Sequence, residues 1–421
     1  MIGAVIPPND QRRLQRRTLF TLIGSVGPAG MGMAGAFAAT TLASKEIVEN
    51  ESLATFAATM ISIGGALVAV PLSRFMARKG RRPGLRIGWT IAAAGAVLAV
   101  LAVETSTYPL LAVGTLCIGA GNGTNLAARY AAADLAPEDR RARSIGILVW
   151  AASIGSILGP TVALGATEPP AEWLGLEPLS GPYLMAFLVF VLAATVVELF
   201  LRPDPLLVAT GGDGVSAPDR PTLRQSFGRI AGNRLAVIAV GAMAVGQAVM
   251  VAVMTVTPLH MDDGAHEQQI IGLVISLHIV GMYLFAPIVG WLVDRLPNSV
   301  IVGTAGITLF VGGEMASHTD AEDRLGVFVG LFLIGLGWSF AMISGSSLLT
   351  GAFNASERAA VQGAADFTMT SAGAVAGLAS GVVVELSSYH SLSHWAGIAA
   401  LGLVAAAIYP VVVDTRQSAA A

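Results

Sequence analysis

Long apolar stretches alternate with short polar breaks along almost the whole chain. Each stretch has about 20 residues, the length that a helix needs to cross a hydrocarbon core about 30 Å thick. The pattern therefore predicts an all-α, polytopic membrane protein with twelve transmembrane helices in two six-helix bundles. The predicted spans are residues 18–42, 53–75, 84–103, 109–131, 144–166, 182–201, 235–258, 269–293, 298–316, 325–349, 359–384 and 393–413.

A polar segment rich in Gly, Pro and Asp separates the sixth predicted span from the seventh. We predict an N-terminal bundle over residues 1–201, a cytoplasmic linker over 202–234 and a C-terminal bundle over 235–421. The composition agrees, since 54% of the residues are hydrophobic and only 12% are charged, which a soluble domain does not tolerate. The single cysteine, Cys117, excludes an intramolecular disulfide. The sequence has no Walker motif, so we expect neither ATP as the energy source nor an enzyme.

Basic residues lie almost entirely on one side of the predicted topology. Of the 24 Lys and Arg residues, 22 share the side of both termini and two, Lys45 and Arg324, lie on the other. Loops rich in Lys and Arg remain in the cytoplasm. We therefore predict a multi-pass protein of a bacterial cytoplasmic membrane with both termini in the cytoplasm. The first apolar run follows an Arg-rich start, but its length of about 25 residues favours a retained helix over a signal peptide.

The two halves share an echo at the end of the second predicted helix of each. Gly290-Trp-Leu-Val-Asp294-Arg295 ends this helix in the second half, and Arg78-Lys79-Gly80-Arg81-Arg82 lies at the equivalent place in the first. We call the turns at these two places the first basic loop, which contains Arg81, and the second basic loop, which begins at Asp294. Together with the six-plus-six layout, these loops resemble the major facilitator superfamily, whose signature loop reads Gly-x-Leu-x-Asp-Arg-x-Gly-Arg-Arg. The first-half copy has Ser73 and Ala77 in place of the Gly and the Asp, whereas Asp294 keeps the acid in the second half. The resemblance implies a substrate site near the membrane midplane and rocking of one half against the other.

The candidate substrate ligands lie on the seventh and eighth predicted helices. Met250 and Met254 are four residues apart, as are His278 and Met282, so each pair shares one helix face. Two thioethers and an imidazole form a soft ligand set, which favours Cu(I) over hard cations. From the helical rise, Met254 lies about 6 Å, Met250 about 12 Å, His278 about 14 Å and Met282 about 20 Å below the outer surface. If the two helices are neighbours, Met250 and His278 share an ion, Met254 receives it and Met282 passes it inward.

Packing offers an alternative for each of these residues. Methionine is a flexible filler of apolar helices, and a lone buried histidine is often hydrogen-bonded to a neighbouring helix. The other histidines fall in loops predicted to be outside. Five residues at the mouth above the Met/His pairs are candidates for collecting metal ions: His260, Met261, Asp262, Asp263 and His266. For His318, His390 and His394 a solvated rim is the favoured interpretation.

The Met-x-x-x-Met and His-x-x-x-Met pattern on consecutive helices resembles the CcoA-like copper importers (CalT), a bacterial branch of the superfamily. The family's four metal-binding positions correspond to Met250, Met254, His278 and Met282 of this sequence. The resemblance implies import of copper into the cytoplasm for assembly of cbb3-type cytochrome c oxidase. Copper is then the transported substrate rather than a cofactor, and we expect no cofactor, no nucleic-acid partner and a monomer in the lipid bilayer.

Several charged residues near the predicted helix ends are candidates for gating or ion pairing. Arg129 and Asp134 could form an ion pair or a proton relay, or act as gate residues at the inner end of the fourth helix. Asp366 in the eleventh span has the same ambiguity, and the resemblance assigns Asp294 and Arg295 to a gate.

Three other functions remain open at this level. A related branch carries riboflavin, and methionines can line an adaptable cavity for a small organic molecule. Gly155-x-x-x-Gly159-Pro160 partly matches the signature of proton-coupled drug exporters, although a bend with close packing explains it equally well. A sensor or assembly partner would bind copper without moving it.

Overall fold

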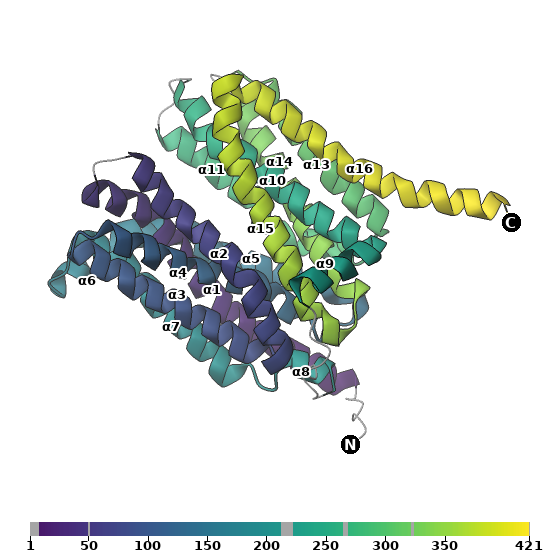
Figure 1. The fold of residues 1–421 in the computed structure, drawn as a ribbon, viewed down its shortest axis with the longest axis horizontal. Coiled ribbons are helices and arrows are strands. Elements are labelled where there is room, and N and C mark those ends of the chain that lie inside the picture. Colours follow the sequence, from purple (N-terminus) through teal and green to yellow (C-terminus); the bar gives the residue numbers. More distant parts are fainter. Residues whose placement is uncertain (1–7, 49–50, 212–221, 264–267, 321–323, 421) are drawn as a thin grey trace. The chain divides into compact units, whose positions relative to one another are not determined.

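A computed structural model describes residues 8–48, 51–211, 222–263, 268–320 and 324–420 (Figure 1). This part of the chain is almost entirely helical and contains no strand. Twelve of its helical segments are long and apolar enough to span a membrane, which confirms the predicted all-α class and number of spans. The helices are α1 (Pro8–Ile47), α2 (Glu51–Lys79), α3 (Arg81–Glu104), α4 (Tyr108–Ala133), α5 (Arg141–Ala166), α6 (Glu168–Trp173), α7 (Gly181–Phe200), α8 (Pro205–Ala209), α9 (Leu223–Gly232), α10 (Arg234–Asp263), α11 (Gln268–Tyr283), α12 (Ala286–Val293), α13 (Asn298–Ser317), α14 (Arg324–Ala352), α15 (Ala355–Leu386) and α16 (Tyr389–Ala420).

The eighth predicted span is interrupted. The single helix predicted over residues 269–293 is instead α11 followed by α12. Pro287 lies in the first turn of α12 and has no amide hydrogen, so the carbonyl of Tyr283 cannot receive the usual bond from four residues on. The break begins after Tyr283, one residue beyond the predicted ligand Met282. Within the predicted linker the structure has two short helices, α8 and α9.

The chain forms two compact units. Unit 1 contains Met1–Ala136, Ala151–Phe227 and Phe353–Phe367; unit 2 contains Pro137–Trp150, Gly228–Ala352 and Thr368–Ala421. In unit 1, α1 packs on α7, α2 on α4, and α3 on both α4 and α7. In unit 2, α13 packs on α14 and α16, and α14 also supports α10 and α11. Each unit therefore has its own helical core.

Close packing accounts for the partial exporter motif. A Cβ atom on Gly155 would collide with the backbone of α1 at Gly27, and one on Gly159 would lie 2.6 Å from the carbonyl oxygen of Met31. Glycines at these two positions let α5 approach α1 closely, as small residues do between membrane helices. This geometry favours the packing interpretation of the motif.

Candidate functional site

His278 on α11 is the most constrained of the predicted ligands. Its side chain is 1% exposed, and its Nδ1 lies 2.7 Å from the carbonyl oxygen of Leu331 on α14. A carbonyl oxygen only accepts, so Nδ1 carries the hydrogen and the neutral imidazole has its lone pair on Nε2. Nε2 is buried and has no hydrogen-bond partner among the described residues. The ring is thus oriented by one nitrogen and offers the other as a ligand atom.

The three methionines differ in their exposure. Met250 on α10 and Met282 on α11 are buried, while Met254, one turn from Met250, is partly exposed. We call Met250, Met254, His278 and Met282 the Met/His group. All four belong to unit 2.

Helix α14 supports both helices that carry the Met/His group. A Cβ atom on Gly335 would lie 3.0 Å from the amide nitrogen of Met282 and 3.3 Å from Nδ1 of His278. On the other side of α14, a Cβ atom on Gly246 of α10 would lie 2.7 Å from the Cβ of Ala341. Consecutive helices were expected to be direct neighbours, whereas α10 and α11 contact each other only slightly and pack mainly on α14. Glycines at both crossings permit this arrangement.

The contacts along α14 give the order of the four predicted ligands. Met243 lies beside Gly345, and Gly246 beside Ala341, so α10 runs antiparallel to α14. His278 contacts Leu331 and Tyr283 contacts Trp338, so α11 runs parallel to α14. At 1.5 Å per residue, the order from the Arg324 end is His278, Met254, Met282 and Met250, in steps of about 3 Å. The two pairs interleave, but Met254 rather than Met250 is nearest in level to His278. The predicted levels differ from these because they were counted from assumed ends of the two helices rather than from their crossings with α14.

Three polar and aromatic side chains between α10 and α11 were not identified from the sequence. The indole Nε1 of Trp338 on α14 donates a hydrogen bond of 2.7 Å to Oε1 of Gln247 on α10. The Trp338 ring also meets the ring of Tyr283 on α11 edge to face, with centroids 5.7 Å apart. Gln247 is three residues from Met250 and therefore shares its face of α10, which is the signal that the sequence offered.

Of the five residues predicted to collect metal ions, the structure describes the side chains of His260 and Met261, and His260 belongs to an aromatic cluster. The His260 ring stacks on Tyr389 at 4.0 Å between centroids and meets His390 edge to face at 5.3 Å. Met261 is buried. His266 lies outside the described residues, as do the side chains of Asp262 and Asp263.

The remaining outer histidines contact Glu314 or backbone. Nδ1 of His394 lies 2.8 Å from Oε1 of Glu314. Nδ1 of His318 lies 2.9 Å from the backbone carbonyl oxygen of Glu314. Nδ1 of His390 lies 2.7 Å from the carbonyl oxygen of Ser317. Across the described ranges, no three His, Cys, Asp or Glu residues are placed to hold a metal ion together.

Unit 1 holds a buried charged network in place of the suggested Arg129–Asp134 pair. Arg129 donates to Oδ1 of Asp366 at 2.5 Å, and the Tyr130 hydroxyl lies 3.1 Å from the same oxygen. Asp134 instead accepts from Nε of Arg81 at 2.8 Å. Five residues along a helix correspond to a rotation of about 140°, so Arg129 and Asp134 point to different sides of α4.

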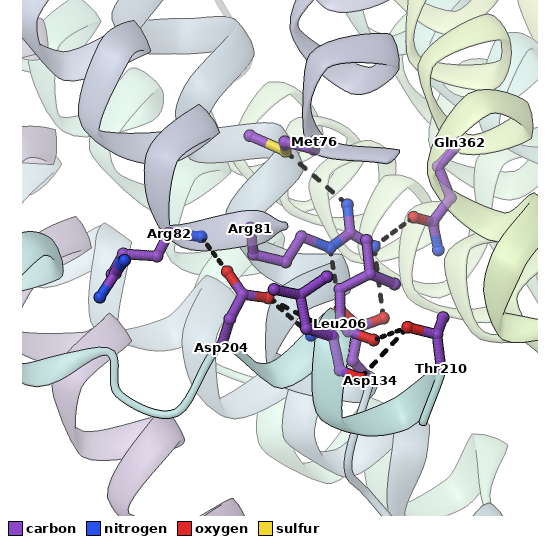
Figure 2. Close-up of polar contacts among 9 residues, drawn as sticks. Met76, Arg81, Arg82, Asp134, Asp204, Leu206, Thr210 and Gln362 are labelled. Atoms are coloured by element: carbon purple, nitrogen blue, oxygen red, sulfur yellow. Dashed lines mark hydrogen bonds and ion pairs between the residues drawn. The ribbon is translucent and has the colours of Figure 1, made fainter. Parts of the chain in front are cut away.

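Figure 2 shows how the first basic loop is held. Nη2 of Arg81 donates to Oδ1 of Asp134 at 3.3 Å and to Oε1 of Gln362 at 2.6 Å. Asp204 accepts from the amide of Arg82 at 2.7 Å, and its other oxygen accepts from the amides of Leu206 and Leu207 at 3.0 and 3.2 Å. One carboxylate therefore caps both α3 and α8.

The second basic loop uses its own acid. Asp294 accepts hydrogen bonds from the amides of Ala142 and Arg143, at 2.9 and 2.8 Å, at the start of α5. Burial raises the pKa of the Asp294 carboxyl, while the hydrogen bonds from these amides act in the opposite direction. The guanidinium of Arg295 lies over the Trp291 ring, 4.2 Å from its centroid. Asp294 thus ties α12 to the first turn of α5 within unit 2.

Comparison with solved structures agrees with the helical architecture. The chain matches a bacterial homologue of the iron transporter ferroportin, in its outward-facing state, with a TM-score of 0.72 and 15% identity, over 94% of this chain and 99% of that one. It matches the E. coli fucose:proton symporter FucP with a TM-score of 0.67 and 16% identity, over 93% and 99% of the two chains. At these identities the likeness concerns the fold alone.

Sequence comparison identifies the family. The chain is 34% identical over 411 residues to the uncharacterized MFS-type transporter YdeG of Bacillus subtilis (strain 168), covering 97% of this chain and 94% of that protein. It is 24% identical over 381 residues to the riboflavin transporter RfnT of Brucella anthropi, covering 90% and 91% of the two. The model of the Major Facilitator Superfamily matches residues 20–378 and 238–420. The family consists of membrane transporters, which are generally not enzymes. This chain belongs to the Major Facilitator Superfamily.

Proposed function

We propose that this chain is a secondary active transporter that imports copper from the periplasm into the cytoplasm of a bacterium by alternating access. In this proposal the copper supplies the assembly of cbb3-type cytochrome c oxidase. The inward direction follows from the resemblance to the copper importers. The predicted topology, with the Arg-rich loops and both termini in the cytoplasm, places the Arg324 end of α14 on the periplasmic side.

The observation that carries the proposal is the state of His278. A buried imidazole nitrogen without a partner is costly in a membrane helix, and such groups mark substrate or ion pathways. Its Nδ1 is fixed on Leu331, so the Nε2 lone pair has a defined direction, as in histidines that bind metals. Met282 follows one turn later on the same helix.

The methionines supply weak, uncharged ligands at successive levels. His278 and Met254 would receive the ion, and Met282 and Met250 would pass it toward the Arg-rich end of the unit. Thioethers favour soft ions, and several weak ligands in series permit both capture and release.

Uptake of radioactive copper by cells or proteoliposomes tests the proposal. His278→Ala and the double variant Met250→Ala/Met254→Ala should abolish uptake while the purified protein keeps its elution profile and helical content. Met315→Leu and His318→Gln are matched controls, because they replace a methionine and a histidine outside the Met/His group. Normal copper uptake by the His278→Ala variant would refute the proposal.

A riboflavin-like substrate is the second candidate, favoured by the likeness to the riboflavin transporter RfnT over 90% of this chain. The aromatic rings of Trp338 and Tyr283 and the amide of Gln247 are groups that organic ligand sites use. Uptake of radioactive riboflavin, with unlabelled copper and unlabelled riboflavin as competitors, separates the two candidates. Riboflavin uptake that survives His278→Ala would favour the flavin.

A further inference from the structure

Trp338 occupies the space between the two helices that carry the Met/His group. Its indole reaches Gln247 of α10 by a hydrogen bond and Tyr283 of α11 by a ring contact. The side chain is 5% exposed, although α10 and α11 barely touch each other directly. Trp338 therefore contacts side chains of both helices.

The level of Trp338 coincides with the inner end of the Met/His group. Trp338 follows Gly335 by three residues, and Gly335 is where α14 meets His278 and Met282. Measured along the axis of α14, Met250 is level with Trp338, and Met282 lies about 3 Å closer to the Arg324 end. Tyr283, whose ring contacts Trp338, is the residue after Met282. The indole thus has the same level along α14 as the last two predicted ligands.

The three helices that carry the Met/His group and Trp338 have no charged side chain along their apolar stretches. Residues 235–261 of α10, 268–283 of α11 and 325–352 of α14 contain no Asp, Glu, Lys or Arg. Thioethers and a neutral imidazole add none. A buried ion without a counter-charge loses its hydration energy, and this loss rises with the square of its charge, so the site favours one positive charge over two.

The face of an indole ring attracts a cation and adds no formal charge. Tryptophan is the strongest of the aromatic residues in this role, and the attraction grows when the site excludes water. The hydrogen bond to Gln247 and the Tyr283 contact hold the ring in one orientation, so little side-chain freedom is lost on binding.

We infer that Trp338 is a cargo-contacting residue that, with the Met/His group, selects a monovalent soft cation, Cu(I), over divalent ions. Gln247 is its positioning residue. The inference rests on the proposed copper function and adds to it a charge state and a fifth contact, which the family resemblance did not supply.

Binding of Ag(I), a monovalent soft ion that does not change its oxidation state, tests the inference on the full-length protein in detergent. Affinity is measured by competition with a chelator, and tryptophan emission is recorded in the same titration. Trp338→Leu should weaken Ag(I) binding about ten- to thirty-fold, and Trp338→Phe less, because phenylalanine keeps a weaker ring face. Ag(I) should quench emission in the native protein, and that quenching should be lost in both variants. Trp395→Phe, at an exposed tryptophan on α16, is the matched control and should change neither result.

The outcomes separate this inference from the proposed function. Native affinity in Trp338→Leu, together with loss of binding in His278→Ala, would overturn the role of Trp338 and leave copper transport standing. Zn(II) binding as tight as Ag(I) binding would overturn the monovalent selection. If the native protein does not bind Ag(I) or Cu(I), or if riboflavin alone quenches Trp338, both proposals fail. Gln247→Leu should weaken Ag(I) binding by a few-fold and reduce the part of the Ag(I) quenching that Trp338→Leu removes.

Discussion

The two basic loops of this chain differ in where their acids come from and in what those acids bind. The second basic loop begins at Asp294, directly after α12, and this residue accepts from the amides of Ala142 and Arg143 on α5. The loop of residues 78–82 in unit 1 has Ala77 where the family pattern has the acid. Its charges and amides are met by Asp134, at the end of α4, and by Asp204, before α8 (Figure 2). The acids that bind the first loop therefore come from other parts of unit 1, whereas the second loop contains its own.

The largest effect should come from breaking the Arg81–Asp134 pair. Asp134→Ala leaves the Arg81 guanidinium, 1% exposed, with Gln362 as its remaining side-chain oxygen. Loss of one partner of a buried ion pair costs about 3–5 kcal/mol of unfolding free energy. We expect a clearly lower Tm for the protein in detergent, measured by circular dichroism.

A double variant serves as the control for that result. Arg81→Met/Asp134→Leu removes both charges, and such apolar replacements are often close to neutral. The double variant should be more stable than Asp134→Ala alone. Equal destabilisation would mean that volume rather than an unpaired charge explains the effect.

Gly80→Ala should be the next most damaging change. Gly80 has a φ of 93°, and a Cβ atom there would collide with the Asp204 carboxylate. The backbone strain alone costs about 1–3 kcal/mol, and the displaced carboxylate adds to it. Gly175→Ala is a matched control, because its φ is 72° and nothing lies within 4 Å of an added Cβ. The Tm of Gly80→Ala should be lower than that of Gly175→Ala. The reverse order would contradict the role of Asp204.

Removal of the capping acids compares the two loops directly. Asp204→Ala frees three amides, those of Arg82, Leu206 and Leu207, whereas Asp294→Ala frees two. With about 0.5–2 kcal/mol for a lost cap, we expect the larger fall in Tm for Asp204→Ala. Asp204→Asn and Asp294→Asn retain an acceptor oxygen, so their Tm should fall less than that of the alanine variants. An equal or larger fall for Asp294→Ala would show that the family acid matters more than its substitute.

The smallest effect is expected from restoring the family pattern. Ala77→Asp in the native background should change the unfolding free energy by about 0.5 kcal/mol or less, since Arg81 already has its acid. In the Asp134→Ala background the same substitution should recover part of the lost Tm. No recovery would mean that position 77 cannot replace Asp134.

The sequence predicted the spans because hydrophobic length is a strong signal in membrane helices. It did not predict the break after Tyr283, although Pro287 was visible, since neighbouring helices often accommodate a proline without a break. Close packing of α5 on α1 was one of two interpretations of Gly155 and Gly159, and the structure agrees with it.

Side-chain partners were harder to predict than spans because they depend on how each helix is rotated and what it crosses. The sequence suggested a pair of Arg129 with Asp134 and named Asp366 separately, whereas the structure joins Arg129 to Asp366 and Asp134 to Arg81. Trp338 was missed because a lone tryptophan in an apolar helix carries no pattern. The Met/His group itself remains a prediction, with α14 now providing its order.

The double cap by Asp204 also has an electrostatic side. The amides at a helix N-terminus carry about half an elementary positive charge. The starts of α3 and α8 together therefore present at most about one elementary positive charge. The carboxylate of Asp204, bonded to both starts, carries one negative charge and offsets them at a single point. The turn between α2 and α3 is rich in arginine, so the carboxylate lowers the positive potential at this turn.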